Sequence, residues 1–355
     1  MAKHQKMSSL QFEDLPDEVI LKSLGFLDIK ELIFCGQVSK RLRSIANDES
    51  LWLKLNFCGR KVPYDFIEKA ALNGCKYLSL TFCSLLGLTG KSELSMDLRY
   101  LNLFGNKCQE MPKLVHKCSS LQKLSLKHLP LQSDYIQFIC QNGQTLQALD
   151  IGNCNIDCDN PTLLQDLFTN CAHLTELSIS GKFRWLDLPQ IQALVDNLTP
   201  TILKVNLSHQ NNLNDEHVKK LVKRCNKITH LDLSFSTLIT NDSVRSIIKH
   251  LNTSLKKLDV SGINVDFATL LQFRSISTLK TLICYGRLDD EEMKNLQQQL
   301  PHIKINHRRE KMLYIACPCK IGVNGSPFGI DFNWIWEIGA KQQELFARHS
   351  VLERI

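Results

Sequence analysis

A six-residue frame with apolar residues at its first, fourth and sixth positions recurs ten times in tandem along this chain. Successive copies begin between 21 residues apart, as from Leu279 to Leu300, and 28 residues apart, as from Leu146 to Leu174. A near-constant step of this size indicates a repeat protein, in which each unit buries its apolar face only against its neighbours. The first positions of the copies are Cys75, Leu98, Leu121, Leu146, Leu174, Ile202, Ile228, Leu255, Leu279 and Leu300.

Each copy of the frame predicts a short strand followed by a helix. In the copy that begins at Leu98, alternation along a strand directs Leu101 and Leu103 to the core and Asn102 outward. The frame and its step are those of leucine-rich repeats, whose period is about 20–29 residues. The sequence therefore predicts an α/β fold, a leucine-rich-repeat solenoid of about ten repeats with a curved parallel sheet and outer helices. Helices are expected at 134–140, 163–168, 215–223 and 242–250.

The repeat also explains many of the 14 cysteines. Some of them precede a copy of the frame by three residues, and others stand where the second copy has Asn106. A small thiol suits the crowded turn between helix and strand, where it packs as a small apolar group. Because no Cys-x-x-Cys pair occurs, we expect no structural zinc and no redox role. The cysteines concerned are Cys118, Cys171 and Cys225, and Cys83 and Cys154.

Composition and charge exclude several classes of protein. With 43% hydrophobic and 22% charged residues, the chain is neither collagen-like nor largely disordered. Residues 1–11 hold no apolar signal-peptide core, and no stretch approaches the ~18 apolar residues of a membrane span. We expect a protein of a reducing intracellular compartment with no membrane partner. The net charge of +7 is diffuse, so no nucleic-acid partner is expected.

Residues 12–57 do not follow the repeat and are predicted to form short helices. Pro16 is suited to a first helical turn, and Asp28 with Glu31 forms a capping-box pattern for a second helix. Asp48 begins a fourth helix. The apolar stripes are Val19, Ile20, Leu24 and Leu27 in the first helix, and Val38, Leu42 and Ile45 in a third.

These residues resemble an F-box. The resemblance rests on Leu15-Pro16, on Leu32, on the run from Val38 to Leu42 and on Ser50-Leu51-Trp52, which appear in that order. The chain as a whole is similar to F-box/leucine-rich-repeat proteins of the S-phase kinase-associated protein 2 type, over most of residues 12–340. Two features depart from that family. Eleven residues precede the F-box where relatives carry a long regulatory extension, and Gly262 stands where a basic residue is expected.

The resemblance implies a non-catalytic substrate-recognition subunit of a cullin-RING (SCF-type) ubiquitin ligase in the nucleus and cytoplasm. It would present phosphorylated cell-cycle regulators, such as cyclin-dependent kinase inhibitors, for ubiquitination and proteasomal degradation. Its partners would be the adaptor S-phase kinase-associated protein 1, the cyclin-dependent kinase regulatory subunit and, indirectly, the cullin scaffold and RING subunit. No nucleotide-binding, metalloprotease or serine-hydrolase motif is present, so neither catalysis nor a cofactor is expected. The expected adaptor-binding residues are Leu15, Pro16, Ile20, Leu24, Leu27, Leu32, Val38, Leu42 and Trp52.

Outward residues of the strands are expected to form a recognition surface for protein, because a repeat sheet offers a long concave face. According to the frame, the outward residues of successive strands form two rows. In the last copy of the frame, His302 falls in the row of Thr281, and Lys304 falls in the row of Ile283. The C-terminal repeats carry the closest resemblance. The expected substrate and accessory-protein residues are His230, Asp232, Ser234, Lys257, Asp259, Ser261, Tyr285, Met312, Tyr314 and Trp336.

The predicted organisation is an F-box at 12–57, a linker at 58–74, repeats at 75–305 and a tail at 306–355. In the related family the tail folds along the concave face, whereas here it could instead cap the last repeat. A helical cap on the solenoid is likewise the structural alternative to an F-box. The functional alternative is a leucine-rich-repeat protein outside any ligase that binds and blocks a partner protein.

Overall fold

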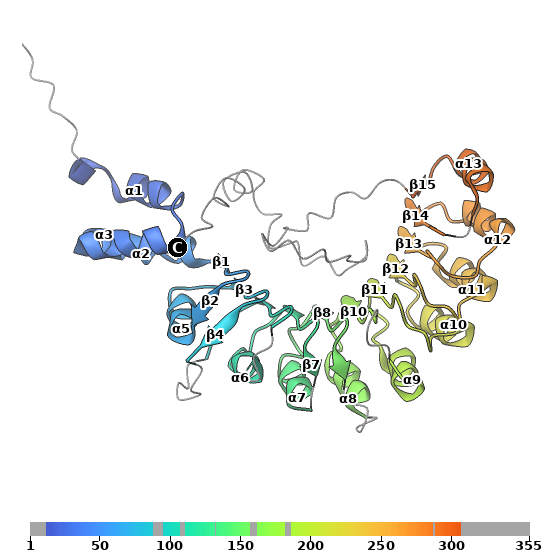
Figure 1. Ribbon diagram of the computed structural model, residues 1–355, viewed down its shortest axis with the longest axis horizontal. Coiled ribbons are helices and arrows are strands. Elements are labelled where there is room, and N and C mark those ends of the chain that lie inside the picture. The colour runs from blue at the N-terminus through green and yellow to red at the C-terminus, as the bar shows by residue number, and fades with distance from the viewer. Residues whose placement is uncertain are drawn as a thin grey trace, which may run out of the picture.

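The computed structural model describes residues 12–87, 95–106, 111–131, 133–156, 162–181, 186–286 and 288–306. In them the chain forms a horseshoe whose strands line the inner face and whose helices form the outer face, as Figure 1 shows. The N-terminal α-helices, α1–α4 (residues 17–52), precede the first strand, and α1–α3 extend from the N-terminal end of the horseshoe (Figure 1). The predicted fold class, an α/β leucine-rich-repeat solenoid behind a small helical module, is confirmed.

Helices and strands alternate along the solenoid. The helices are α1 (Asp17–Leu24), α2 (Ile29–Val38), α3 (Lys40–Ala46), α4 (Glu49–Trp52), α5 (Tyr64–Leu72), α6 (Met111–His116), α7 (Ser133–Gln141), α8 (Leu163–Asn170), α9 (Leu188–Asn197), α10 (Asp215–Arg224), α11 (Asn241–Leu251), α12 (Phe267–Leu271) and α13 (Asp290–Gln299). Short 3₁₀ helices are η1 (Phe12–Asp14) and η2 (Gln272–Ser275). The strands of the main sheet are β1 (Lys54–Asn56), β3 (Tyr77–Ser79), β5 (Tyr100–Asn102), β6 (Lys123–Ser125), β8 (Ala148–Asp150), β10 (Glu176–Ser178), β11 (Lys204–Asn206), β12 (His230–Asp232), β13 (Lys257–Asp259), β14 (Thr281–Ile283) and β15 (Lys304–Ile305). Outside it lie β2 (Lys61–Pro63) with β4 (Ser84–Leu86), and β7 (Pro130–Leu131) with β9 (Asn155–Ile156).

The main sheet has 11 parallel strands in the order of the sequence. The central residue of each strand, such as Leu101 or Leu231, is buried, and the flanking residues lie on the concave face. The four helices expected from the sequence are α7, α8, α10 and α11, and each is slightly longer than its apolar pattern. One continuous core of leucine, isoleucine and valine runs beneath the sheet from the F-box to β15.

The predicted role of the cysteines is confirmed for those described. Cys118, Cys171 and Cys225 are fully buried. At the position of Asn106, whose amide donates to Leu80 O at 2.7 Å, a thiol makes the same bond between repeats. Cys83 Sγ donates to Phe57 O at 2.8 Å and Cys154 Sγ to Leu126 O at 3.0 Å.

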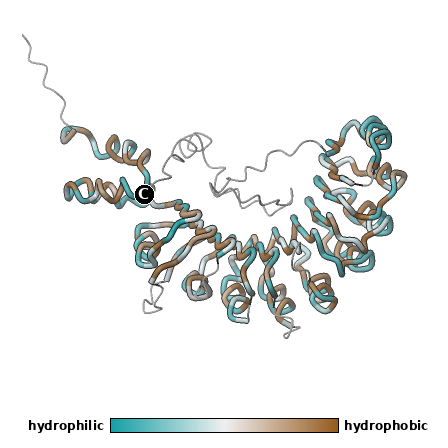
Figure 2. Tube along the Cα trace, viewed as in Figure 1, coloured by the Kyte–Doolittle hydropathy of each residue, from teal (hydrophilic) through white to brown (hydrophobic). Residues whose placement is uncertain are grey.

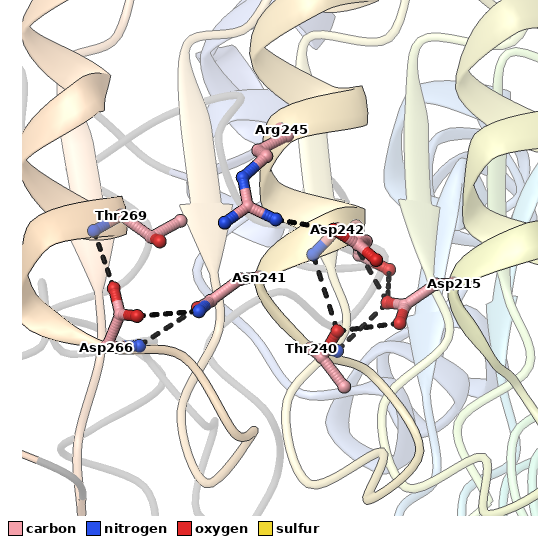
Figure 3. Close-up of polar contacts among 8 residues, drawn as sticks. Asp215, Thr240, Asn241, Asp242, Arg245, Asp266 and Thr269 are labelled. Atoms are coloured by element: carbon pink, nitrogen blue, oxygen red, sulfur yellow. Dashed lines mark hydrogen bonds and ion pairs between the residues drawn. The ribbon is translucent and has the colours of Figure 1, made fainter.

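Acidic residues at the helix N-termini link successive C-terminal repeats (Figure 3). Asp215 of α10 accepts hydrogen bonds from Thr240 Oγ1 at 2.7 Å and Ser243 N at 3.1 Å, at the start of α11. Burial alone would raise the pKa of Asp215, but the bonds from Ser243 and Thr240 lower it. In the next repeat, Asp266 Oδ2 accepts from Asn241 Nδ2 at 2.7 Å. These carboxylates therefore have a structural role.

One boundary prediction is wrong. The expected linker at 58–74 contains β2 and α5, and buried Ile67 and Ala70 of α5 belong to the core, so it is part of the first repeat. The first strand of the main sheet, β1, lies within the predicted F-box range 12–57 and pairs with β3. At the other end, β15 is displaced by two residues from the frame, so that Lys304 rather than His302 pairs with Thr281. The frame cannot show this slip, because a shift of two residues keeps the same side chains inward.

Helices α1–α4 form the F-box-like module. Asp28 caps α2 in the predicted capping box: Asp28 Oδ1 accepts from Glu31 N at 2.9 Å, and Asp28 N donates to Glu31 Oε2 at 2.8 Å. Val38 ends α2 and does not belong to the third helix, because Ser39 has an extended backbone and caps α3. Arg41 Nε donates to Asp17 Oδ1 at 2.8 Å and so joins α3 to α1.

The module and the solenoid share one core. The indole of Trp52 is buried, donates from Nε1 to Ala46 O at 2.7 Å, and packs 5.9 Å from the ring of Phe66 in α5. Leu53 O then accepts from Lys76 N and Tyr77 N at 3.0 and 3.1 Å, which continues the sheet directly. Packing and backbone hydrogen bonds therefore join the two parts without a flexible connection.

Candidate functional site

The F-box-like module exposes a set of large apolar side chains. Phe34 and Val38 lie four residues apart on α2 and are 66% and 76% exposed. Phe26, between α1 and α2, is 62% exposed. Figure 2 shows hydrophobic residues along these helices as well as along the inner strands. The exposed set, here called the F-box apolar face, is Phe12, Val19, Phe26, Phe34 and Val38. Exposed apolar side chains of this size in one small module are typical of a protein-binding surface.

The structure separates the predicted adaptor-binding residues into three groups. Ile20, Leu24, Leu32 and Trp52 are buried in the core, so their predicted direct contact with an adaptor is corrected, and they hold the module together instead. Pro16 and Val38 are exposed and can contact a partner directly. Leu15, Leu27 and Leu42 are half-buried against the core.

Sequence reasoning missed Phe12, Phe26 and Phe34. The available signal was that α2 is apolar on two faces: Leu32 and Gly36 face the core, while Phe34 and Val38 face out. A surface helix needs only one apolar stripe to pack on its own protein. A second stripe on a surface helix therefore indicates a partner.

On the concave face, one row of strand residues is partly exposed and mostly basic toward the C-terminus. This row, here called the concave row, consists of Glu176, Lys204, His230, Lys257, Thr281 and Lys304. Lys204 Nζ pairs with Glu176 Oε1 at 3.0 Å, and His230 and Lys257 occupy the next two strands. Lys304 is exposed on the last strand. Burial, followed by the charges of Lys204, Lys257 and Lys256, lowers the pKa of His230 to about 4. His230 is thus a neutral hydrogen-bonding group within a positive row at neutral pH.

The second predicted row has a structural role, and its expected part in recognition is corrected. Asp232 and Asp259 are buried, and each Oδ1 accepts from the backbone N–H two residues later, at 2.9 Å, in Ser234 and Ser261. Ser234 Oγ donates to Asp232 Oδ1 at 2.7 Å, and Ser261 Oγ accepts from Tyr285 N at 3.1 Å. These side chains shape the turn after each strand. The same bond occurs at Asn56, Asn102, Asp150 and Asn206.

Two carboxylates meet in this second row. Asp232 and Asp259 are register partners on neighbouring strands. Burial, and then the charge of Asp232, raise the pKa of Asp259 to about 7. A buried pair of like charges destabilises the fold when both groups are ionised.

Tyr285 lies at the edge of the concave face, where its ring is 50% exposed and its hydroxyl donates to Asn306 O at 3.0 Å. It remains available for contact with a partner. The predicted contacts Met312, Tyr314 and Trp336 lie outside the described residues.

In the described part of the chain, no three His, Cys, Asp or Glu side chains come together in a way that could hold a metal ion. Over the same residues, no helix combines the length and apolar character needed to cross a membrane.

Comparison with known proteins identifies the families to which the chain is similar. Residues 70–338 match the family described as SKP2 LRR domain, and residues 12–58 match the F-box-like family. The chain is 21% identical over 300 residues to the F-box/LRR-repeat protein 12 of Bos taurus, covering 81% of this chain and 83% of that protein.

Two solved structures also align with the chain. They are the leucine-rich repeat-containing protein LegL7 from Legionella pneumophila, with a TM-score of 0.41 and 15% identity, and an internalin (inlF) from Listeria monocytogenes, with 0.40 and 16%. The alignments cover 69% and 66% of this chain, and 81% and 72% of those proteins.

An F-box-like region followed by leucine-rich repeats of this kind indicates a substrate-recognition subunit of an SCF-type ubiquitin ligase. Such proteins are generally non-catalytic, and the F-box implies an SKP1-type adaptor. Since the family match spans most of its length, the chain belongs to the SKP2 LRR domain family, with an F-box-like region before the repeats.

Proposed function

We propose that this protein presents phosphorylated cell-cycle regulators, such as cyclin-dependent kinase inhibitors, to an SCF-type ubiquitin ligase for ubiquitination and proteasomal degradation. The observation that carries the proposal is the pairing of two surfaces on one core. The F-box apolar face lies before β1, and the concave sheet follows it without a flexible connection. A receptor of this kind acts by proximity, because it holds its substrate near an enzyme supplied by other subunits.

The charge of the concave row supports a phosphorylated substrate. Lys204, Lys257 and Lys304 lie on β11, β13 and β15, and Glu176 is the acidic residue of the row. Lysine side chains attract phosphate as positive point charges. Charge of this kind contributes chiefly to specificity and to the rate of encounter.

An accessory protein, the cyclin-dependent kinase regulatory subunit, would share this surface. Half-exposed Tyr285 is the described residue suited to contact it, because aromatic side chains are frequent anchors in protein interfaces. The remaining partners would be S-phase kinase-associated protein 1, a cullin and a RING subunit. The protein would act in the nucleus and cytoplasm.

Co-purification with the adaptor tests the proposal. Phe34→Asp combined with Val38→Asp should abolish capture of the adaptor by the full chain, because charges replace the most exposed apolar side chains of α2. The matched control is Leu72→Asp with Leu188→Asp, which places the same charges on exposed leucines of α5 and α9.

The control variant should capture the adaptor as well as the original chain does. Unchanged capture by the Phe34/Val38 variant would count against the F-box role. The chain would then fit better a leucine-rich-repeat protein that binds and blocks a partner outside any ligase.

A further inference from the structure

In three consecutive C-terminal repeats, the segment that runs from the last helical turn toward the next strand carries Lys and Arg but no Asp or Glu. These segments are 223–230 from the end of α10, 249–256 from the end of α11 and 274–280 from the end of η2. We call their basic residues the basic edge: Lys223, Arg224, Lys227, Lys249, Lys256, Arg274 and Lys280.

The backbone brings these segments together at one edge of the solenoid. Lys256 N donates to Thr229 O at 2.7 Å, and Lys280 N donates to Lys256 O at 2.8 Å. Lys256 and Lys280 therefore precede neighbouring parallel strands, whose spacing is about 4.8 Å. The basic edge lies where the strands β12, β13 and β14 begin, and the concave row lies along the strands themselves.

The charges of the basic edge are not balanced within the described part of the protein. None of its exposed side chains forms an ion pair in that part of the protein. These side chains are Lys223, Arg224, Lys227, Lys249, Lys256, Arg274 and Lys280. The ion pairs of α10 and α11, Glu216 with Lys219 and Asp242 with Arg245, lie at the opposite ends of the helices.

Helix stability does not require this concentration of charge. A basic residue in the last turn complements the helix dipole. However, α7, α8, α9 and α13 have no basic residue in the last turn. From α7 to α13, basic last-turn residues therefore occur in α10, α11 and η2, which belong to three neighbouring repeats.

The opposite edge has a different character. There the acidic residues Asp215 and Asp266 are engaged in capping and inter-repeat hydrogen bonds (Figure 3). Asp289 caps α13 in the same way. The acidic edge thus has a structural function. Of the basic edge, Arg224 also supports the fold, because its Nε donates to Leu198 O at 2.8 Å, whereas the lysines form no ion pair in the described part of the protein.

From this arrangement we propose that the basic edge docks an acidic, extended segment of a partner protein. Charge complementarity identifies the occupant, and exposed lysines favour fast electrostatic encounter. A single-stranded nucleic acid fits less well, because the three segments contain no Phe, Tyr or Trp on which bases could stack. Phe273, next to Arg274, is buried.

A duplex also fits less well. The acidic edge lies one helix length, about 15 Å, from the basic edge. Its carboxylates would repel the phosphates of the second strand of a duplex. The docking surface goes beyond the proposed function, because it lies outside both the F-box apolar face and the concave row.

Fluorescence anisotropy on the full chain tests this inference, with a labelled oligoglutamate peptide and an oligothymidylate of equal charge as probes. Lys256→Glu with Lys280→Glu should weaken peptide binding by roughly tenfold. The matched control, Lys61→Glu with Lys294→Glu, changes the net charge equally at exposed lysines away from the basic edge and should leave binding nearly unchanged. Circular dichroism checks that both variants fold.

Added salt should weaken binding of the peptide to the original chain. Equal binding by the two variants would overturn the inference. Tighter binding of oligothymidylate than of oligoglutamate would assign the edge to nucleic acid instead. Concentration-dependent self-association without peptide binding would assign it to a second copy. Adaptor capture, measured on the same samples, is independent of all these outcomes and separates them from failure of the proposed function.

Discussion

The aromatic ring of Phe235 lies against Gly262, at the point where a Cβ on that glycine would come within 2.6 Å of the ring. Both residues have positive φ, 59° and 68°, and occupy the same turn position in successive repeats. The ring of Phe82 covers Gly105 in the same manner. The glycine found where family resemblance suggested a basic residue therefore has a local explanation, since it makes room for the aromatic side chain of the preceding repeat.

This relationship predicts that Gly262→Ala destabilises the protein by more than backbone strain alone. A left-handed backbone costs a non-glycine residue about 1–2 kcal/mol, and displacement of the Phe235 ring adds to that cost. Gly286→Ala is the matched control, because Gly286 has φ of 91° but no atom near its would-be Cβ. Urea unfolding of both variants should show the larger loss for Gly262→Ala. Equal losses would mean that the ring moves aside freely.

A second prediction concerns the carboxylate pair in the buried row. Because the pKa of Asp259 is raised from 3.8 to about 7, the folded state binds its proton more tightly than the unfolded state does. The stability associated with that proton is complete below pH ~4 and is lost as the pH rises to about 7. Asp259→Asn keeps the acceptor for Ser261 N and removes the repulsion, so its stability advantage should grow over that range, to at most about 4 kcal/mol.

The reverse substitution provides the control for this pH dependence. Asn206 is the register partner of Asp232, so Asn206→Asp places a new carboxylate beside it. Thermal unfolding at pH 5 and pH 8 should show this variant to be destabilised more at pH 8. An Asp259→Asn advantage that is the same at both pH values would contradict the predicted repulsion.

A third prediction concerns the junction between the F-box-like module and the solenoid. Trp52→Ala should destabilise the protein by about 3–5 kcal/mol, because it empties a buried site against Phe66. Trp52→Phe should cost less, about 1–3 kcal/mol, chiefly through the unpaired Ala46 O. Phe26→Ala, at an exposed position, should change the unfolding free energy by less than about 0.5 kcal/mol. A large loss in that variant would show that Phe26 supports the fold.

Much of the fold follows from periodicity. The frame that includes Leu101 and Leu231 fixes which strand residues enter the core, and the pair Asp28 and Glu31 marks the start of α2. These features depend on residues close together in the sequence. Sequence reasoning can find them because alternation and capping are local properties.

The candidate site was less predictable because exposure is decided by neighbours distant in the sequence. Leu32 and Phe34 are both apolar and nearly adjacent, yet only the packing of α2 against α3 determines which is buried. Asp232 was expected to face a partner, but its carboxylate turns back to the N–H of Ser234. The two-residue displacement of β15 likewise depends on pairing with β14.

The shared core at Trp52 and Leu53 has a consequence for how repeat number matters in this protein. With no hinge between the two binding surfaces, each repeat added to or removed from the solenoid would turn the C-terminal strands by a fixed increment relative to α1–α4. A chain shortened by one repeat would keep both surfaces chemically intact but would present its C-terminal strands in a different direction. The number of repeats therefore sets the orientation of the concave sheet relative to α1–α4.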